Sequence, residues 1–137
     1  FRNAILKSVS KGMNIWGTCA GMIVASRRLT DPYPKPLGLI DIQVSRNWYG
    51  RQINSFEVDI PFNNIGSKLF PGIFIRAPLI ASVDESKSSI EVLARLSDGT
   101  PVAVEQNNKK YKTLVTSFHP ELTDDLRVHQ YFVKMSE

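Results

Sequence analysis

One stretch of this chain reads Met13-Asn14-Ile15-Trp16-Gly17-Thr18-Cys19-Ala20-Gly21, an apolar run that leads directly into the only cysteine. The run predicts a short buried strand over residues 13–16. Small residues on both sides of Cys19 allow the sharp, strained turn that presents a nucleophile at the end of a strand. We expect a helix over residues 20–29 to start at this turn. The stretch therefore indicates a strand–turn–helix unit that carries a cysteine nucleophile.

A second cluster, Ser117-Phe118-His119-Pro120-Glu121, follows another apolar run near the other end of the chain. A thiol becomes an effective nucleophile when an imidazole takes its proton and a third group orients that imidazole. Cys19, His119 and Glu121 can fill these roles as a Cys-His-Glu triad. Each residue alone has an ordinary reading, since a lone cysteine is usually a small buried apolar residue. The joint pattern favours catalysis.

The turn after Cys19 predicts two further electrostatic effects. The free N–H groups and the positive dipole end of a helix that starts there would lower the thiol pKa. The backbone N–H of Ala20 would point to where negative charge develops on a tetrahedral intermediate, which provides half of an oxyanion hole. The other half must come from elsewhere.

The remaining elements are predicted from short apolar runs bounded by Gly, Pro, Asn or Asp. We expect helices near both ends, one over residues 1–12 and one that begins with Thr123 as N-cap and packs through Val128, Phe132 and Met135. Exposed connections are expected at 31–36, where three prolines exclude a helix, and at 82–89. The predicted strands are 13–16, 39–46, 54–60, 72–76, 91–95, 102–106 and 113–118. These elements indicate a three-layer α/β domain with a mixed sheet.

Composition excludes several classes of function. The 137 residues are 42% hydrophobic and 22% charged, which fits one domain with a real core. Seventeen basic and thirteen acidic residues give a net charge of +4 that is spread along the chain, which argues against a nucleic-acid groove. A single cysteine forms no internal disulfide, and no apolar run reaches the roughly 20 residues that span a bilayer. We therefore expect a cytoplasmic protein.

Metal binding has little support in the sequence. Cys19, His119 and His129 lack the close spacing of zinc-ligand pairs. His129 is expected to be an ordinary polar residue on the last helix.

The motifs resemble those of the class I glutamine amidotransferases, which carry a Gly-x-Cys-x-Gly turn and a distant His-x-Glu. The resemblance is closest to one subfamily, the glutaminase subunits of pyridoxal 5'-phosphate synthase, and it extends over essentially the whole chain. Seven motifs occur in the subfamily's order: Gly17-Thr18-Cys19-Ala20-Gly21, Leu37-Gly38-Leu39, Arg46-Asn47, Gly50-Arg51-Gln52, Ser55-Phe56-Glu57, Phe74-Ile75-Arg76-Ala77-Pro78 and Ser117-Phe118-His119-Pro120-Glu121-Leu122-Thr123.

The resemblance implies a flavodoxin-like class I glutamine amidotransferase domain that hydrolyses L-glutamine to L-glutamate and ammonia. It implies that Cys19 is the nucleophile and that His119 and Glu121 complete the triad. Arg46 is similar to the family's glutamine-binding arginine, and Ile75 and Arg76 to a pair that contacts the substrate through its backbone. The ammonia would pass to a synthase subunit that builds pyridoxal 5'-phosphate. Neither a metal nor a bound cofactor is implied for this chain.

One departure from the subfamily leaves alternatives open. Its members begin with strands and a Gly-Gly-Glu-Ser-type loop that supplies the remaining oxyanion donor, and this region is absent before Phe1. We therefore expect an N-terminally truncated domain whose first strands are missing, with residues 1–12 forming the helix after that loop. A non-catalytic binding subunit of the same complex, or another cysteine-dependent hydrolase or amidotransferase of this fold, would also fit.

Overall fold

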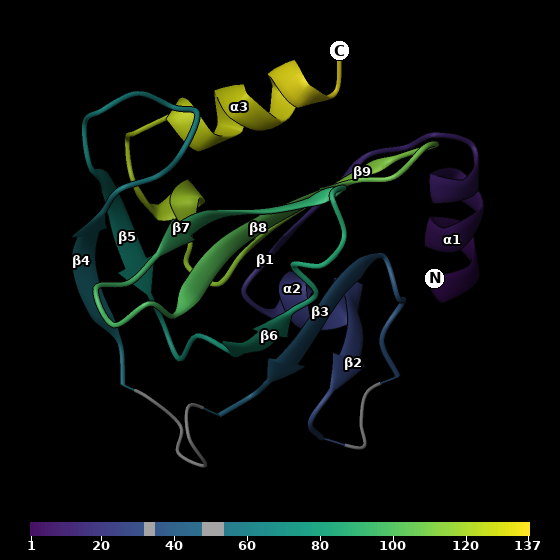
Figure 1. Ribbon diagram of the computed structural model, residues 1–137, viewed down its shortest axis with the longest axis horizontal. Coiled ribbons are helices and arrows are strands. Elements are labelled where there is room, and N and C mark those ends of the chain that lie inside the picture. Colours follow the sequence, from purple (N-terminus) through teal and green to yellow (C-terminus); the bar gives the residue numbers. More distant parts are fainter. Residues whose placement is uncertain (32–34, 48–53) are drawn as a thin grey trace.

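The central layer of the molecule is a four-stranded mixed sheet, shown in Figure 1. The computed structural model describes residues 1–31, 35–47 and 54–137. Strand β1 pairs in parallel with β9, whereas β9 with β8 and β8 with β7 are antiparallel. The order across the sheet is β1 (Ile15–Thr18), β9 (Lys112–Thr116), β8 (Pro101–Asn107) and β7 (Ile90–Arg95).

Each face of the central sheet is covered, because successive side chains of a strand point to opposite faces. Buried Val115 packs with Met22 and Ile40, which belong to α2 (Ala20–Ala25) and β3 (Ile40–Ser45). Strand β3 lies between β2 (Ser26–Leu29) and β6 (Leu79–Val83) in a second sheet. Figure 1 shows this layer below the central sheet.

The opposite face buries the neighbouring residue of β9, Leu114, together with Val128 of α3 (Arg127–Met135). The hairpin of β4 (Phe56–Ile60) and β5 (Phe70–Phe74) contributes Phe70 and Phe74 to the same core. In Figure 1, α3 lies above the central sheet. The three-layer α/β architecture with a mixed sheet is therefore confirmed.

The helix predicted over residues 20–29 is wrong in its second half. Helix α2 ends at Ala25, and Ser26 adopts the extended conformation with φ −62° and ψ 160°. From Ser26 on, the chain forms β2 and pairs in parallel with β3. Strand β6 was also not predicted, and Ser82 and Val83 belong to it rather than to the expected connection. In both cases pairing with a distant strand decides the conformation of a weakly patterned segment.

The N-terminal and C-terminal helices form as predicted, as α1 (Arg2–Ser10) and α3, but the predicted N-cap of α3 is wrong. Thr123 instead closes the 3-10 helix η1 (Pro120–Leu122), and its hydroxyl donates to the Pro120 carbonyl at 3.1 Å. The side chain that bonds to the first turn of α3 is Asp125, whose carboxylate accepts a hydrogen bond from the Arg127 backbone N–H at 3.1 Å.

His129 lies on the last helix as predicted, but its surroundings are not those of an ordinary polar residue. Its ring packs edge-on against Trp16 with centroids 4.8 Å apart, and its Nδ1 is buried without a hydrogen-bond partner among the described residues. Phe132 and Met135 pack against the core beside it, as predicted. None of the helices in the described part of the chain has the length and apolar character needed to cross a membrane.

Candidate active site

Cys19 lies at the sharp turn between β1 and α2. Its φ of 50° and ψ of −108° are rare for a residue with a side chain, and such strain is held in place by the surrounding structure. The Cys19 N–H donates to the Thr116 carbonyl at 2.9 Å, and the Cys19 carbonyl accepts the Met22 N–H at 3.0 Å. These bonds fix both sides of the turn, so the predicted strained turn is present.

The glycine before the turn is required by contact between β1 and α2. A Cβ atom at Gly17 would lie 2.6 Å from the carbonyl carbon and oxygen of Gly21. A Cβ atom at Gly21, by contrast, would meet nothing within 4 Å. Only the first of the two glycines therefore serves this close approach.

His119 and Glu121 follow β9, the strand that pairs in parallel with β1. Thr18 lies opposite Thr116, so both strands end at the same edge of the sheet. The Nδ1 of His119 lies 2.7 Å from Oε2 of Glu121, and these side chains are 20% and 45% exposed. The His119 N–H donates to the Ile73 carbonyl at 2.9 Å, which ties this segment to β5. The topology thus brings all three predicted triad residues to one edge.

Burial raises the pKa of the Cys19 thiol above its ordinary value. The hydrogen bond from the Ala20 N–H acts in the opposite direction, and the Glu121 carboxylate raises the pKa further. The Ala20 N–H at the helix start therefore lowers the pKa of Cys19 as expected, but the prediction that this pKa falls below its ordinary value is wrong. Helix α2 has six residues, and its first N–H group does not offset the desolvation of the sulfur. Such a thiol depends on a base to remove its proton.

Ile75 and Arg76 follow β5 and stand beside the nucleophile. The Cys19 Sγ lies 3.9 Å from the Ile75 carbonyl oxygen, within reach of a weak S–H donor. Arg76 is exposed and has a φ of 44°, a second strained position next to the thiol. The backbone of this predicted pair therefore lies directly beside the sulfur.

Arg46 directly follows β3, and the described contacts do not bring its side chain to Cys19. Its backbone N–H donates to Asp31 Oδ2 at 3.4 Å, and its side chain is exposed. The motif Gly50-Arg51-Gln52 lies outside the described residues. A hollow of about 670 Å³ between β4 and β7 includes none of the predicted site residues.

A cysteine nucleophile, an imidazole paired with a carboxylate and a backbone N–H beside the sulfur form the arrangement that acyl transfer requires. The model of the SNO glutamine amidotransferase family matches residues 1–137, the whole chain. The chain belongs to this family. A solved glutamine amidotransferase structure shares the fold with a TM-score of 0.81 and 39% sequence identity, over 98% of this chain and 67% of that one.

Two curated relatives of this SNO-family chain carry the name pyridoxal 5'-phosphate synthase subunit PdxT. The protein from Dehalococcoides mccartyi is 50% identical over 129 residues, which are 93% of this chain and 63% of the relative. The protein from Thermoplasma acidophilum is 47% identical over 133 residues, which are 97% of this chain and 60% of the relative. The chain thus spans less than two thirds of the length of either relative.

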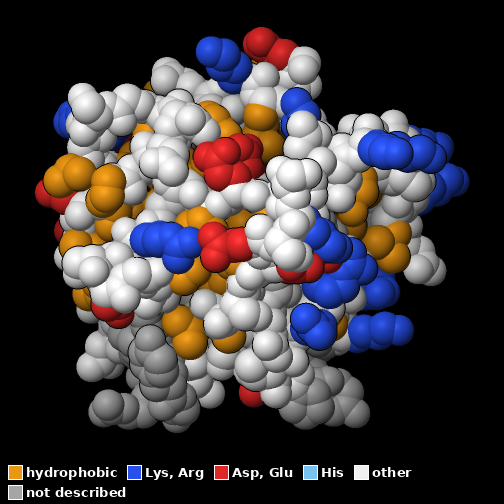
Figure 2. All heavy atoms as spheres, in the orientation of Figure 1, with side chains coloured by type: hydrophobic (Ala, Val, Ile, Leu, Met, Phe, Trp, Pro, Cys, Tyr) orange, Lys and Arg blue, Asp and Glu red, His pale blue; other side chains and the backbone are white. Residues whose placement is uncertain are grey.

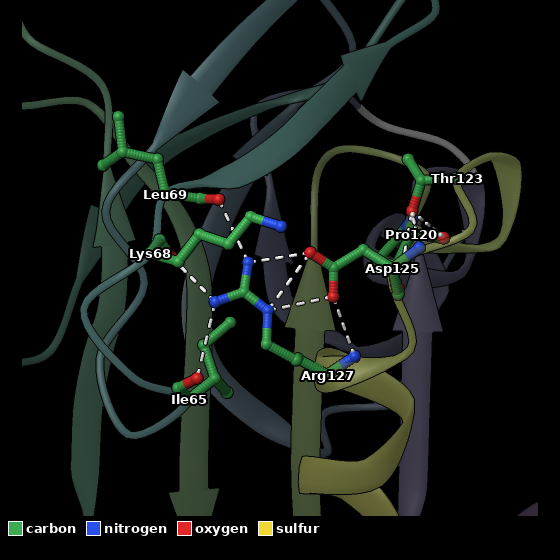
Figure 3. Close-up of polar contacts among 7 residues, drawn as sticks. All are labelled: Ile65, Lys68, Leu69, Pro120, Thr123, Asp125 and Arg127. Carbon is green, nitrogen blue, oxygen red and sulfur yellow. Dashed lines mark hydrogen bonds and ion pairs between the residues drawn. The ribbon is translucent and has the colours of Figure 1, made fainter.

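An ion-pair clamp that sequence reasoning missed braces the segment after the triad, as Figure 3 shows. The Arg127 guanidinium contacts both carboxylate oxygens of Asp125, the shortest contact being 2.7 Å. It also donates to the carbonyls of Lys68 at 2.7 Å and Leu69 at 3.0 Å, just before β5. The clamp therefore ties the start of α3 in this SNO-family domain to the strand that holds His119.

The described part of the SNO-family chain contains no group of three or more His, Cys, Asp or Glu residues that could hold a metal ion. The signal that could have revealed the clamp is the pair Asp125 and Arg127, but nothing in the sequence indicates that the Lys68 and Leu69 carbonyls of a distant loop complete it. The Ile73 carbonyl that holds His119 is likewise invisible in the sequence.

Proposed function

We propose that this chain carries the catalytic site of a glutaminase, which hydrolyses L-glutamine to L-glutamate and ammonia. One observation carries the proposal: Cys19 and the hydrogen-bonded pair of His119 and Glu121 follow neighbouring parallel strands and meet at one sheet edge. The strain at Cys19 supports it, since sparsely populated backbone conformations cluster at active sites.

In the proposed reaction, His119 takes the thiol proton while Sγ of Cys19 attacks the side-chain carboxamide carbon of glutamine. With Nδ1–H of His119 donating to Glu121, Nε2 is the basic nitrogen, and Glu121 stabilises the imidazolium that forms. The Ala20 N–H, already a partner of the sulfur, donates to the oxyanion. His119 then protonates the leaving nitrogen, ammonia departs, and a thioester remains on Cys19.

Hydrolysis of the thioester completes the cycle. His119 takes a proton from water as the water oxygen attacks the thioester carbon, and the proton returns to sulfur as glutamate leaves. The raised pKa of the thiol makes this base necessary at neutral pH.

For substrate binding we propose the Ile75 and Arg76 backbone and the Arg46 side chain. The Ile75 carbonyl, 3.9 Å from the sulfur, would accept a hydrogen bond from the substrate. Arg46 would pair with the glutamine carboxylate. Arg46→Ala is therefore expected to raise KM with little change in kcat, and an unchanged KM in a steady-state glutaminase assay would limit Arg46 to a structural role.

The names of the relatives support a partner, because both are subunits of pyridoxal 5'-phosphate synthase. We propose that the ammonia passes to a synthase subunit that uses it to build pyridoxal 5'-phosphate, and that this occurs in the cytoplasm. The free thiol of Cys19 supports that compartment, because the reducing cytosol keeps cysteines in the thiol form.

The test compares the two histidines of this protein. Cys19→Ala and His119→Gln should each lower glutamate release by about a thousandfold or more. His129→Gln, a matched control on α3, should retain activity because its ring contacts Trp16 and no triad residue. Wild-type rates in Cys19→Ala would refute the triad. An inactive wild-type protein that still binds the synthase subunit would support a non-catalytic binding subunit.

A further inference from the structure

One buried residue of β9, Thr116, contacts both the segment of the nucleophile and the segment of the base. Thr116 is completely buried, in contrast to the Lys, Arg, Asp and Glu side chains that Figure 2 shows on the molecular surface. A buried hydroxyl takes its hydrogen-bond partners from the protein, because an unpaired polar group away from water is destabilising. The partners of Thr116 therefore show what this residue holds in place.

The main chain of Thr116 is bonded to the nucleophile. Its carbonyl accepts the Cys19 N–H at 2.9 Å. The N–H at the other end of the same peptide unit, that of Ser117, donates to the Val102 carbonyl at 2.9 Å. A peptide unit is planar, so bonds at both of its polar ends fix its orientation. The Cys19 turn is therefore attached to a peptide unit of fixed orientation at the end of β9.

The side chain of Thr116 is bonded to the segment of the base. Its hydroxyl donates to the Phe118 carbonyl at 3.2 Å. The other polar end of that peptide unit is the His119 N–H, which donates to the Ile73 carbonyl at 2.9 Å. The peptide unit that leads into His119 is thus also fixed at both ends. Its orientation determines where the side chain of His119 begins.

Trp16 of β1 sets the direction of the Thr116 hydroxyl. The indole N–H can only donate, and it lies 3.3 Å from the Thr116 Oγ1. The hydroxyl oxygen accepts this bond, so its own proton is left for the Phe118 carbonyl. The Trp16 ring also packs against Phe132 of α3, with centroids 5.7 Å apart, and so keeps a support in the His129→Gln control. The hydrogen bonds from Trp16 through Thr116 therefore run in one direction and end at the peptide of the base.

We propose that Thr116 is the positioning residue that sets the imidazole of His119 against the thiol of Cys19, an inference that rests on the proposed function. Its carbonyl holds the nucleophile and its hydroxyl holds the peptide of the base, so one residue fixes both groups relative to each other. Proton transfer between sulfur and imidazole depends on this geometry. A misplacement of about 1 Å costs about a hundredfold in rate.

Thr116→Val tests the side-chain bond alone. Valine has a similar shape and keeps the main-chain bond to Cys19, but it offers no donor to the Phe118 carbonyl and no acceptor to Trp16. We expect kcat for glutamine hydrolysis to fall about 10–100-fold. KM should stay within about twofold, because the proposed substrate contacts lie in other segments. Thr116→Ser restores the hydroxyl and should recover most of the wild-type kcat.

Thr113→Val is the matched control on the same strand. The Thr113 side chain is also completely buried, and its hydroxyl donates to the Leu39 carbonyl at 3.1 Å. Thr113 lies opposite Ile15, at the end of β9 away from Cys19. Removing its hydroxyl should lower the midpoint of urea unfolding without lowering kcat, which is measured where every variant is fully folded. The control separates the loss of a buried hydrogen bond from the loss of positioning.

A second readout does not require turnover. A thiol is alkylated by iodoacetamide faster when a nearby base takes its proton, so His119→Gln and Thr116→Val should each lower the alkylation rate of Cys19 by about threefold or more at neutral pH. Because Thr116 acts through His119, Thr116→Val should lower this rate no further in the His119→Gln background. An additional fall in the double variant would assign Thr116 a general effect on the fold and overturn the inference.

The outcomes separate the two proposals. Wild-type kcat in Thr116→Val, or an equal loss of kcat in Thr113→Val, would overturn the role of Thr116 and leave the glutaminase in place. Trp16→Phe removes the N–H that orients the hydroxyl and should lower kcat about threefold to tenfold. It carries the test if Thr116→Val does not fold, and an unchanged kcat would then refute the inference. A wild-type protein without glutaminase activity, whose alkylation does not respond to His119→Gln, would refute the proposed function itself.

Discussion

Replacing Gly17 by alanine tests whether the close approach of β1 to α2 builds the active-site turn. The new Cβ would lie 2.6 Å from the Gly21 carbonyl carbon and oxygen and 3.0 Å from the Met22 nitrogen. All three atoms are backbone, so no side-chain rotation can relieve the contact. Overpacking of this kind costs about 1–3 kcal/mol, and a rigid backbone neighbour favours the upper end.

The lower entropy of the unfolded alanine chain offsets up to about 1 kcal/mol of this cost. We therefore expect Gly17→Ala to lower the free energy of unfolding by about 2 kcal/mol. For a domain of 137 residues this corresponds to a fall in Tm of about 4–10 °C. Relief of the clash also requires α2 to move relative to β1, which displaces Cys19. A displacement of about 1 Å lowers kcat by about a hundredfold.

Gly21→Ala provides the matched control, because a Cβ there has open space and the residue lies within α2. Its unfolding free energy should stay the same or rise by up to about 1 kcal/mol. Urea unfolding and the glutaminase rate of both variants decide the comparison. Equal stability of Gly17→Ala and the wild-type protein would refute the steric argument, as would an equal loss in both variants.

Three further predictions follow from single contacts. Burial raises the pKa of Cys19, so its alkylation rate should reach half-maximum at a higher pH than that of a free thiol. The rate can be followed by mass spectrometry of the Cys19 peptide. A lower midpoint would contradict the desolvation of the sulfur. Burial alone would raise the pKa of Asp41, but hydrogen bonds from Lys87, Gln106 and Arg27 lower it from 3.8 to about 2. The Asp41 carboxylate therefore contributes about 1–2 kcal/mol to the free energy of unfolding after solvent screening. This contribution is complete above about pH 4 and is lost as the pH falls toward 2. Asp41→Asn should show no such loss of stability in acid unfolding. Arg127→Lys removes the fork that reaches Asp125 and two carbonyls and should cost about 1–3 kcal/mol in urea unfolding, whereas an unchanged midpoint would show that the clamp adds no stability.

The local patterns predicted the elements that carry strong apolar runs. The strand expected at 113–118 appears as β9 and the one at 102–106 as β8, each within two residues of its predicted ends. The strand expected at 13–16 forms two residues later, because pairing with β9 extends it to Thr18. The segment 26–29 carries two arginines and no alternation, so nothing local distinguishes its parallel pairing with β3 from a continued helix.

The sequence by itself determined which residues are chemically able to act at the site: a lone thiol between small residues, a His-x-Glu motif and the strands that precede both. Those features depend on residue type and short spacing, which are local. Tertiary structure alone decided that Thr18 and Thr116 end side by side, and that desolvation outweighs the Ala20 N–H in setting the pKa of Cys19. The paired strands lie about a hundred positions apart in the chain, and the burial of Cys19 depends on segments that are also distant in sequence, so no local pattern specifies either.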